Sequence, residues 1–358
     1  MNKNRLTGKL VSLLLTLCIL FACAAAAGET ALVSLVGDCS IGDAIQYIGY
    51  GSSYHACLEK NGMEWPFSLV RDYFLSDDLT VANLEVVLTE LTAHKNKVFP
   101  LRGKPEFARV LKLAGIEAVN TVNNHCEDFK RGGYKDTLKA LEAEGILYFG
   151  SNRPTNKKNG YNYILVTEAG GLRFGILGIS YPQNNDYKWI CSEIPRLKGE
   201  EGCDVVIVSL HWGQETHKLP TKGQISNGKK LIDAGADVIY GHHAHVLQPI
   251  HFYKGKPILY STGNFTFGTM SNVDPDTGIF QLTWEKTADG TELKQLRVIP
   301  CRTQKGPDFR PYELEDETER KALWQKLIYP KDVKDCDTLP ASFAETGIVD
   351  LVHGAFAE

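Results

Sequence analysis

Residues 237–245 read DVIYGHHAH, a short apolar run that leads through a glycine into three histidines within four positions. The run from Asp237 to Tyr240 predicts a β-strand, because it is short and rich in β-branched and aromatic residues. Few structural reasons place three histidines so close together, whereas imidazole is a common ligand of transition metals. The stretch therefore predicts a metal site just past the end of a strand.

Four other apolar runs lead in the same way into side chains that can bind metal. These predicted strands are Ala31–Val36 before Asp38, Leu79–Leu84 before Glu85, Glu117–Val122 before Asn124, and Asp204–Leu210 before His211. In an open α/β sheet the loops at the carboxyl ends of the strands converge, and ligands bind there. Because five separate runs follow this rule, we expect one shared site.

The expected ligands combine oxygen and nitrogen donors: Asp38, Glu85, Asn124, His211, His243 and His245. A hydrolytic metal centre needs such donors on a rigid frame, with a coordination position left open for water. The spacing of His243 and His245 predicts that both imidazoles lie on the same side of an extended segment. Each motif alone is weak, because a Gly-Asp pair is usually a turn and a lone histidine is usually an ordinary surface residue. Their recurrence at successive strand ends favours a site.

The predicted strands alternate with helical segments, which indicates an α/β fold. Pro105–Ala114 and Tyr134–Glu144 read as helices that each stop at a glycine, and Tyr312–Ile328 reads as a charged, amphipathic helix. Two hairpins are expected, one over residues 161–179 and one over residues 278–299.

The chain begins with a basic segment, and an apolar run that ends in three alanines follows it. This is the layout of a secretory signal peptide, residues 1–27, and it predicts export to the cell surface or the medium. The apolar run is short for a membrane-spanning helix that also needs flanks. Leu20–Cys23 also resembles a lipoprotein cleavage site, although Phe21 is bulkier than that motif usually accepts, so a lipid anchor at Cys23 stays open.

The rest of the chain is acidic. Removing residues 1–27, which hold Lys3, Arg5 and Lys9 and no acid, changes the formal net charge from −4 to −7. Nucleic-acid binding relies on clustered positive charge, so this composition argues against a nucleic-acid partner. The remaining length suffices for one large α/β domain.

Several motifs together resemble the CapA family, which is associated with poly-γ-glutamate capsule synthesis and is related to calcineurin-like metallophosphoesterases. In chain order these motifs are Gly37-Asp38, Ala82–Glu85, Asn123–His125 with Asp128, His211–Gly213 with Glu215, Gly241–Pro249, and Ser261–Phe265. The resemblance covers about residues 31–268, and the histidine block is its most specific part. It implies a four-layer α/β/β/α sandwich of metallophosphoesterase-like type for residues 28–302, with residues 303–358 as a C-terminal extension packed on that domain.

The resemblance also implies roles for single residues. Asp38 and His245 correspond to ligands of a first metal, and Glu85 corresponds to the carboxylate that bridges two metals. The ligands of the second metal correspond to Asn124, His211 and His243. His125 corresponds to a general acid that protonates a leaving oxygen. Residues implied to bind substrate or to support the ligands are Asn83, Asp128, Trp212, Glu215, His242 and Asn264. For Trp212, packing in the core is an equal alternative. The implied cofactor is one or two divalent ions, with Mn, Fe, Zn and Mg all open.

One position departs from the wider superfamily. Phosphoesterases of that superfamily usually carry Asp-x-His in the first motif, and the same spacing here gives Asp38-Cys39-Ser40. A serine hydroxyl is a poor metal ligand beside imidazole, so we expect the first metal position to be weaker or to be filled differently.

The function that follows is the synthesis, processing or handling of an anionic capsule polymer such as poly-γ-glutamate, through a metal-dependent, hydrolase-like site. Two alternatives stay open. One is an exported metallophosphoesterase that acts on a phosphoester substrate. The other is a non-catalytic, metal-binding assembly subunit that works with membrane capsule synthase subunits. Turnover by the purified protein separates the enzymes from the assembly subunit.

We predict that the mature protein, residues 28–358, is found outside the cytoplasmic membrane, because residues 1–27 have the layout of a cleaved signal peptide. Cell fractionation followed by N-terminal sequencing of the recovered chain checks this. Recovery of the full-length, uncleaved chain from the cytosol would contradict export, and with it a substrate in the cell envelope.

Overall fold

A computed structural model describes residues 29–152, 154, 160–268, 274–331 and 333–357. The predicted leader, residues 1–27, and the candidate lipid attachment site Cys23 lie outside these described residues. Within the described ranges, no helix is long and apolar enough to cross a membrane.

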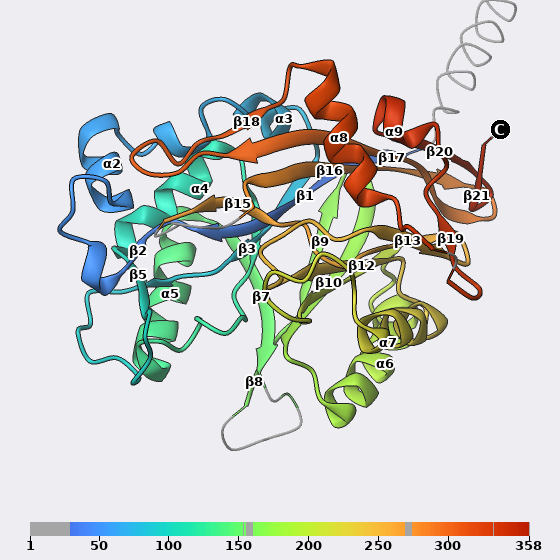
Figure 1. The fold of residues 1–358 in the computed structure, drawn as a ribbon. Helices are drawn as coiled ribbons and strands as arrows, with labels where there is room; N and C mark the ends of the chain where they lie inside the picture. Colours follow the sequence, from blue (N-terminus) through green and yellow to red (C-terminus); the bar gives the residue numbers. More distant parts are fainter. Residues whose placement is uncertain (1–28, 153, 155–159, 269–273, 332, 358) are drawn as a thin grey trace, which may run out of the picture.

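Two mostly parallel sheets lie face to face in the centre of the molecule (Figure 1). The first sheet has the order β7-β6-β3-β1-β16-β17, in which β7, β6, β3 and β1 run parallel. Its strands are β1 Thr30–Ser40, β3 Leu79–Leu84, β6 Ala118–Asn120, β7 Leu147–Asn152, β16 Asp276–Thr287 and β17 Gly290–Thr303. A short strand, β15 Asn264–Phe267, pairs with the carboxyl end of β1.

The second sheet has the order β9-β10-β11-β12-β14-β13, in which β10, β11, β12 and β14 run parallel. Its strands are β9 Leu165–Ala169, β10 Leu172–Ser180, β11 Val205–His211, β12 Val238–His242, β13 Ile250–Tyr253 and β14 Lys256–Leu259. Strand β7 pairs with β6 in the first sheet and also with β10, through Ser151 and Ile179. The two sheets therefore meet along one edge, and their parallel strands end close together.

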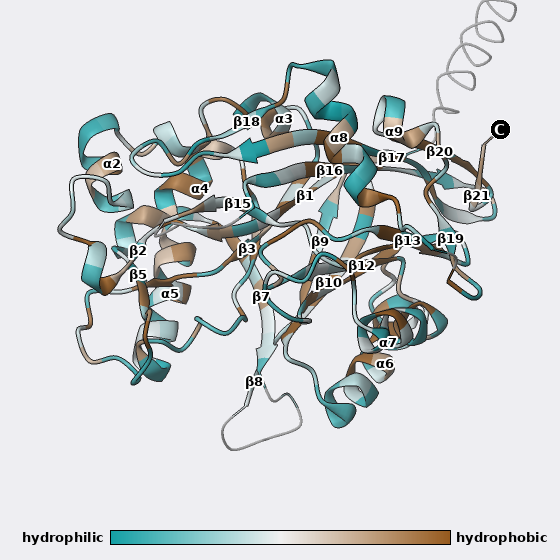
Figure 2. Cartoon of the chain, in the orientation of Figure 1, coloured by the Kyte–Doolittle hydropathy of each residue, from teal (hydrophilic) through white to brown (hydrophobic). Residues whose placement is uncertain are grey.

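Helices cover the outer face of each sheet. The first sheet is covered by α2 Tyr54–Asn61, α3 Arg71–Leu75, α4 Ala108–Ala114 and α5 Lys130–Glu144, and the second by α6 Asn184–Gly199 and α7 Lys222–Asp233. Alternate residues of β11 belong to different cores: Val205 and Ile207 face the other sheet, whereas Val206 and Val208 face the helices. Hydrophobic residues accordingly concentrate along the central strands (Figure 2). This arrangement confirms the predicted four-layer α/β/β/α sandwich.

The C-terminal segment packs against both sheets. Its elements are β18 Pro311–Glu313, α8 Glu317–Leu327, β19 Asp337–Thr338, α9 Phe343–Thr346, β20 Ile348–Val352 and β21 Ala355–Phe356. Strand β20 pairs with β17 of the first sheet, and β19 pairs with β13 of the second. Trp324 of α8 is buried in the core between the sheets and donates its indole N–H to the carbonyl of Val298 at 2.9 Å.

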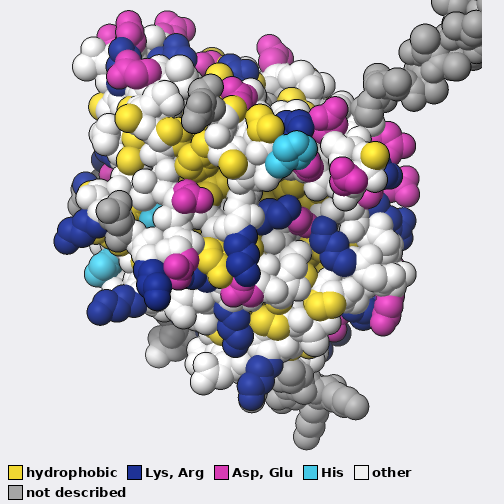
Figure 3. Space-filling model, turned by 90° about the vertical axis from the view of Figure 1, so that its right-hand side faces the viewer, with side chains coloured by type: hydrophobic (Ala, Val, Ile, Leu, Met, Phe, Trp, Pro, Cys, Tyr) yellow, Lys and Arg dark blue, Asp and Glu magenta, His cyan; other side chains and the backbone are white. Residues whose placement is uncertain are grey.

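The face beside these C-terminal strands carries lysine and arginine side chains near its middle (Figure 3). Helix α7 and the segment before β19 form a groove of about 510 Å³ lined by Lys222, Lys229, Lys230 and Lys334. Acids balance part of this charge, since Lys229 pairs with Asp335. The overall acidity of the chain is thus unevenly spread over its surface.

Several elements differ from the sequence expectations. Strand β1 does not stop at Val36 but continues to Ser40, because β15 supplies a parallel partner, and a bulge follows Asp38. The expected hairpin over residues 161–179 is divided, since β8 Tyr161–Tyr163 pairs with β7 and only β9 pairs with β10. Helices α6 and α7 were not predicted. In α6, Pro195 interrupts the helical sequence pattern. In α7, the capping box formed by Thr221 and Gln224 is a signal that could have been recognised from the sequence.

Gly37 and Gly241 allow strand ends to approach one another closely. A Cβ atom on Gly37 would lie 2.2 Å from the carbonyl oxygen of Gly263, and one on Gly241 would lie 2.0 Å from the carbonyl oxygen of Tyr260. Both neighbours are backbone atoms, which move only if a whole segment shifts. A side chain at either glycine would therefore push apart segments that end at the polar cluster described below.

We expect Gly241→Ala to lower the free energy of unfolding by at least about 1–3 kcal/mol, the range for overpacking a dense interior. Gly199→Ala is the matched control, because no atom of the described residues lies within 4 Å of its Cβ position at the end of α6. Alanine there should be neutral or should stabilise by up to about 1 kcal/mol. Urea unfolding followed by circular dichroism checks both variants, and equal midpoints would show that the close approach at Gly241 is not a constraint.

Candidate metal centre

The carboxyl ends of the parallel strands bring the predicted ligands together from both sheets. Glu85 follows β3, Asp38 lies in the bulge of β1, and Asn124 lies in the loop after β6. From the second sheet, His211 ends β11, and His243 and His245 follow β12. All six side chains thus lie at one edge of the sandwich, as the sequence predicts.

Glu85 lies at the centre of this cluster. Its side chain is fully buried, and its Oε1 atom has no hydrogen-bond partner in the described part of the chain. Three imidazole Nε2 atoms surround that oxygen, those of His245 at 3.7 Å, His211 at 3.9 Å and His125 at 4.0 Å. Burial, reinforced by the nearby charge of Asp38, raises the pKa of Glu85 well above its ordinary value. A buried carboxylate that lacks a partner is costly, and a cation held between it and neutral imidazoles removes that cost. The donor set therefore fits a divalent metal.

Asp38, the second buried carboxylate, is held by several donors. Asn83 donates its side-chain N–H to Asp38 Oδ1 at 2.8 Å, and the backbone N–H of His243 points to Oδ2 at 3.3 Å. The Nδ1 atoms of His242 and His245 lie 3.0 and 3.4 Å from its carboxylate oxygens. Burial alone would raise the pKa of Asp38, but the hydrogen bond and charge of His242 outweigh it and lower that pKa. Asp38 is therefore fixed as an anion beside Glu85.

Two histidines of the second sheet, His211 and His243, are held in the neutral form that binds metal. Burial lowers the pKa of His211 well below its ordinary value and that of His243 to about 4, so both imidazoles are neutral near pH 7. His211 Nε2 lies 3.0 Å from the side-chain oxygen of Asn124, and its ring centroid lies 4.7 Å from that of His243. His211 and His243 of the second sheet thus lie beside Asn124, which follows a strand of the first sheet.

The backbone around the two last histidines differs from the expectation. We expected His243 and His245 to share one side of an extended segment, but β12 ends at His242, and both residues have positive φ angles of 88° and 55°. Their rings still lie within 5.8 Å of each other. Such φ values are unfavourable outside glycine and persist only where surrounding contacts impose them, commonly at functional sites.

His125 forms a separate pair with Asp128 at the edge of the cluster. Its Nδ1 lies 2.7 Å from Asp128 Oδ2, and its Nε2 is directed towards Glu85. Burial lowers the pKa of His125, and Asp128 opposes this shift. Lys97 Nζ donates to Asp128 Oδ1 at 2.8 Å and to the carbonyl oxygen of Asn124 at 3.0 Å. Asp128 thus fixes the imidazole orientation, leaving Nε2 free to exchange a proton with a bound molecule.

Glu215 also reaches the cluster. Its carboxylate forms one group of potential metal ligands with His243 and His245, while Asp38, Glu85 and His245 form another, and the ligand atoms within each group lie within 4.8 Å of one another. Ser40, which stands where the superfamily has histidine, is buried, and its Oγ has no hydrogen-bond partner among the described residues. Glu215 thus offers a further carboxylate beside His243 and His245.

The residues expected to support the ligands fall into two groups. Asn83 and His242 are buried partners of Asp38, and Asn264 lies 2.9 Å from His245 Nδ1 through its side-chain oxygen. Asp128 is buried as well, but it pairs with His125 and not with a predicted ligand. The position of Trp212 does not fit a contact with substrate. Its indole is buried in the core between the second sheet and its helices, and it donates to the carbonyl of Tyr260 at 3.0 Å. Core packing, the alternative weighed for Trp212, is the observed role.

Two residues of the site were missed by sequence reasoning. The hydroxyl of Tyr181 lies 2.6 Å from His243 Nε2, and Tyr181 directly follows β10, so the strand-end rule would have identified it. Lys97, described above with Asp128, lies in a long irregular segment between β4 Val87–Leu88 and β5 Leu101–Gly103. Nothing in the local sequence of Lys97 distinguishes it from a solvated lysine.

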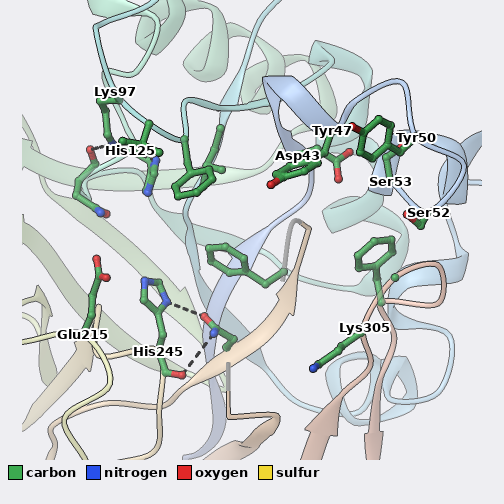
Figure 4. A pocket seen from close by; sticks show the side chains of 18 residues that line it. Asp43, Tyr47, Tyr50, Ser52, Ser53, Lys97, His125, Glu215, His245 and Lys305 are labelled. Carbon is green, nitrogen blue, oxygen red and sulfur yellow. Dashed lines mark hydrogen bonds between the residues drawn. The ribbon is translucent and has the colours of Figure 1, made fainter. Parts of the chain in front are cut away.

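A cavity of about 840 Å³ opens onto the cluster (Figure 4). Its metal-side end is lined by Asn124, His125, Glu215, His245 and Asn264. This volume is in the range of about 300–1,000 Å³ that small-molecule sites occupy. The cluster is therefore accessible to a ligand from solvent.

Comparison with known proteins identifies related sequences over most of the chain. The family described as bacterial capsule synthesis protein PGA_cap matches residues 32–269. The capsule biosynthesis protein CapA of Bacillus anthracis is 29% identical over 338 residues, which cover 86% of this chain and 78% of that protein. The PGA biosynthesis protein CapA of Bacillus subtilis (strain 168) is 28% identical over 269 residues, covering 72% and 68%. Among solved structures, the NAD nucleotidase of Haemophilus influenzae superposes with a TM-score of 0.45 at 14% identity, covering 86% of this chain and 64% of that one.

We predict that His211→Ala and His243→Ala each weaken binding of a divalent transition metal at least about 10-fold, because each removes a ligand from a site with few ligands. His55→Ala and His353→Ala are the controls: His55 pairs with Asp43, and exposed His353 pairs with Glu292. Elemental analysis of matched preparations, with melting temperatures to exclude misfolding, checks this. Equal metal content in all four variants would dispose of the site.

Proposed function

This chain belongs to the bacterial capsule synthesis protein PGA_cap family, and we propose that it is an exported, metal-dependent protein of hydrolase type that acts on an anionic capsule polymer such as poly-γ-glutamate. The relatives named above are described as capsule or PGA biosynthesis proteins. The proposal that this chain handles such a polymer rests on that family and on the chemistry of its site. Its export rests on the predicted leader.

The observation that carries the metal proposal is the unpartnered Oε1 atom of buried Glu85, with three imidazole nitrogens within 4.0 Å. The residues that would hold one or two ions are Asp38, Glu85, Asn124, His211, His243 and His245, together with Glu215, whose carboxylate lies near His243 and His245. Imidazole suits Zn and Fe, and mixed carboxylate and imidazole donors suit Mn, whereas Mg prefers oxygen ligands alone. The donor set therefore favours Mn, Fe or Zn.

A divalent ion bound there supplies Lewis-acid polarisation of a carbonyl or phosphoryl oxygen and makes water a better nucleophile. The chain's own contribution to the reaction is proton transfer and orientation. Asp128 accepts a hydrogen bond from Nδ1–H of His125, which leaves Nε2 facing the cluster at the metal-side end of the cavity. A protonated Nε2 can donate to the leaving group of a substrate bound in the cavity, and the neutral ring can take a proton back. His125 is thus the proposed general acid.

His125→Ala should keep its fold and its metal, because the ring is not among the proposed ligands. Its turnover should fall by about 10²- to 10⁴-fold, the usual contribution of a positioned acid. The loss should be smaller for a γ-glutamyl nitrophenyl ester, whose leaving group needs no proton, than for a γ-glutamyl amide. Asn124→Ala is the comparison variant and should lower both metal content and turnover, because Asn124 is a proposed ligand.

Metal content and melting temperature are measured for the parent and both variants, together with rates on the two γ-glutamyl substrates and on a nitrophenyl phosphodiester. If His125→Ala turns over both substrates at the parent rate, the acid role is wrong. If the metal-loaded parent turns over only phosphoesters, the chain is an exported metallophosphoesterase. If it turns over neither substrate class, the chain is a metal-binding assembly subunit that works with membrane capsule synthase subunits.

A further inference from the structure

Lys97 reaches the metal-side end of the cavity from a segment that carries none of the proposed ligands. It lies in the irregular residues 89–100 between β4 and β5, whereas Asn124 and His125 lie in the loop after β6. Its Nζ atom lies 3.0 Å from the carbonyl oxygen of Asn124, 3.2 Å from His125 Nδ1 and 2.8 Å from Asp128 Oδ1. In Figure 4, Lys97 and His125 accordingly lie side by side. One ammonium group thus touches a proposed ligand, the proposed acid and the partner of that acid.

The peptide group that joins Asn124 to His125 is held at both ends. Lys97 donates a hydrogen bond to its oxygen, and its N–H donates one to Asn123 Oδ1 at 3.0 Å. Asn123 in turn donates its side-chain N–H to the carbonyl oxygen of Leu84, the last residue of β3, at 2.8 Å. Because this peptide sets the backbone direction of both residues, the two hydrogen bonds orient the Asn124 amide and the His125 imidazole together.

The carboxylate of Asp128 is likewise held through both of its oxygens. Oδ1 accepts a hydrogen bond from Lys97, whereas Oδ2 accepts from the backbone N–H of Leu101 at 2.8 Å and from His125 Nδ1 at 2.7 Å. Hydrogen bonds between charged groups are short and strong, and this one is partly shielded from water, since the side chains of Lys97 and Asp128 are 30% and 1% exposed. Loss of Lys97 therefore loosens the carboxylate that orients the His125 ring.

We propose that Lys97 is a positioning residue that fixes the ligand Asn124 and the acid His125 in one arrangement, so that metal binding and proton transfer depend on the same ammonium group. Lys97 acts through these two residues and not on the reacting atoms. This inference deepens the proposed function and rests on it for the reaction in which His125 takes part. The orientation of the His125 ring does not depend on turnover, so it is tested separately.

Lys97→Met removes the ammonium group and keeps an unbranched side chain. An imidazole N–H that is hydrogen-bonded to a carboxylate gives a downfield proton NMR signal that exchanges slowly with solvent. For His125 Nδ1–H this signal is measured on the mature chain with and without zinc, and its absence in His125→Ala assigns it. In Lys97→Met the signal should be lost or should exchange at least about 10-fold faster, the effect of losing one hydrogen bond to a charged group.

Two further measurements follow the same variant. Zinc affinity, measured by competition with a chelator, should fall several-fold in Lys97→Met, because the Asn124 amide is no longer held in place. The kcat for the γ-glutamyl amide should fall about 10- to 100-fold with KM unchanged, since the acid is misplaced and the substrate is not. In a His125→Ala background the same substitution should cost little further turnover.

Lys95→Met is the matched control. Lys95 lies in the same segment, but its side chain pairs with Glu127 at 2.9 Å and is 48% exposed. Its NMR signal for His125, zinc affinity and kcat should equal those of the parent. Melting temperatures are compared for both variants, and Lys97→Gln replaces Lys97→Met if the methionine variant does not fold.

An unchanged His125 Nδ1–H signal or an unchanged zinc affinity in Lys97→Met would overturn the proposal, whether or not the protein turns over substrate. Equal losses in Lys95→Met and Lys97→Met would also overturn it, because they would indicate a general loosening of residues 89–100. If Lys97→Met alone loses the signal and zinc affinity in a protein without hydrolase activity, the positioning role is supported and the proposed enzyme is rejected.

Discussion

Two carboxylates, Glu85 and Asp38, are fully buried where the two sheets meet, and the rest of the site is arranged around them. Neighbouring like charges in a low-dielectric interior repel each other and lose hydration, so each needs compensation. Asp38 receives it from Asn83 and from the imidazole of His242. Glu85 Oε1 has no hydrogen-bond partner among the described residues, and three imidazole nitrogens lie within 4.0 Å of it. A buried group of this kind fits the bound cation that we propose.

This need for compensation accounts for the surroundings of the ligands. Asn120 donates a hydrogen bond to the side-chain oxygen of Asn83 at 2.9 Å, and Asn83 donates one to Asp38. These two side-chain amides fix the position of the Asp38 carboxylate. Asn264 fixes the ring of His245. His243 and His245 hold unfavourable φ angles, which persist only where the surrounding structure imposes them. Residues such as Asn83 and Asn264, which hydrogen-bond to the proposed ligands, orient those side chains before a metal binds. Less side-chain entropy is then lost when the metal binds.

Sequence patterns predicted the parts of this structure that depend on local rules. Apolar runs that end in polar residues identified the strands and the convergence of Glu85, His211 and the other ligands at one edge. The same rules could not show that β15 would extend β1 past Asp38, since that pairing joins Asp38 to Asn264, far along the chain. Nor could these rules show whether Trp212 packs in the core or contacts substrate, because a tryptophan next to a predicted ligand is compatible with both. Lys97 has no local signal either, and only the folded chain brings it to Asn124 and Asp128.

The central claim is that Glu85 and the imidazoles around it bind a divalent metal. Diffraction from crystals of the mature chain, collected on both sides of the Mn, Fe and Zn absorption edges, tests it most directly. The account predicts an anomalous peak within about 2.0–2.3 Å of a Glu85 oxygen and of at least one of the nitrogens of His211, His243 and His245. Crystals grown with these ions that show no anomalous peak at Glu85, with its Oε1 bonded to water or to a protonated histidine instead, would contradict it.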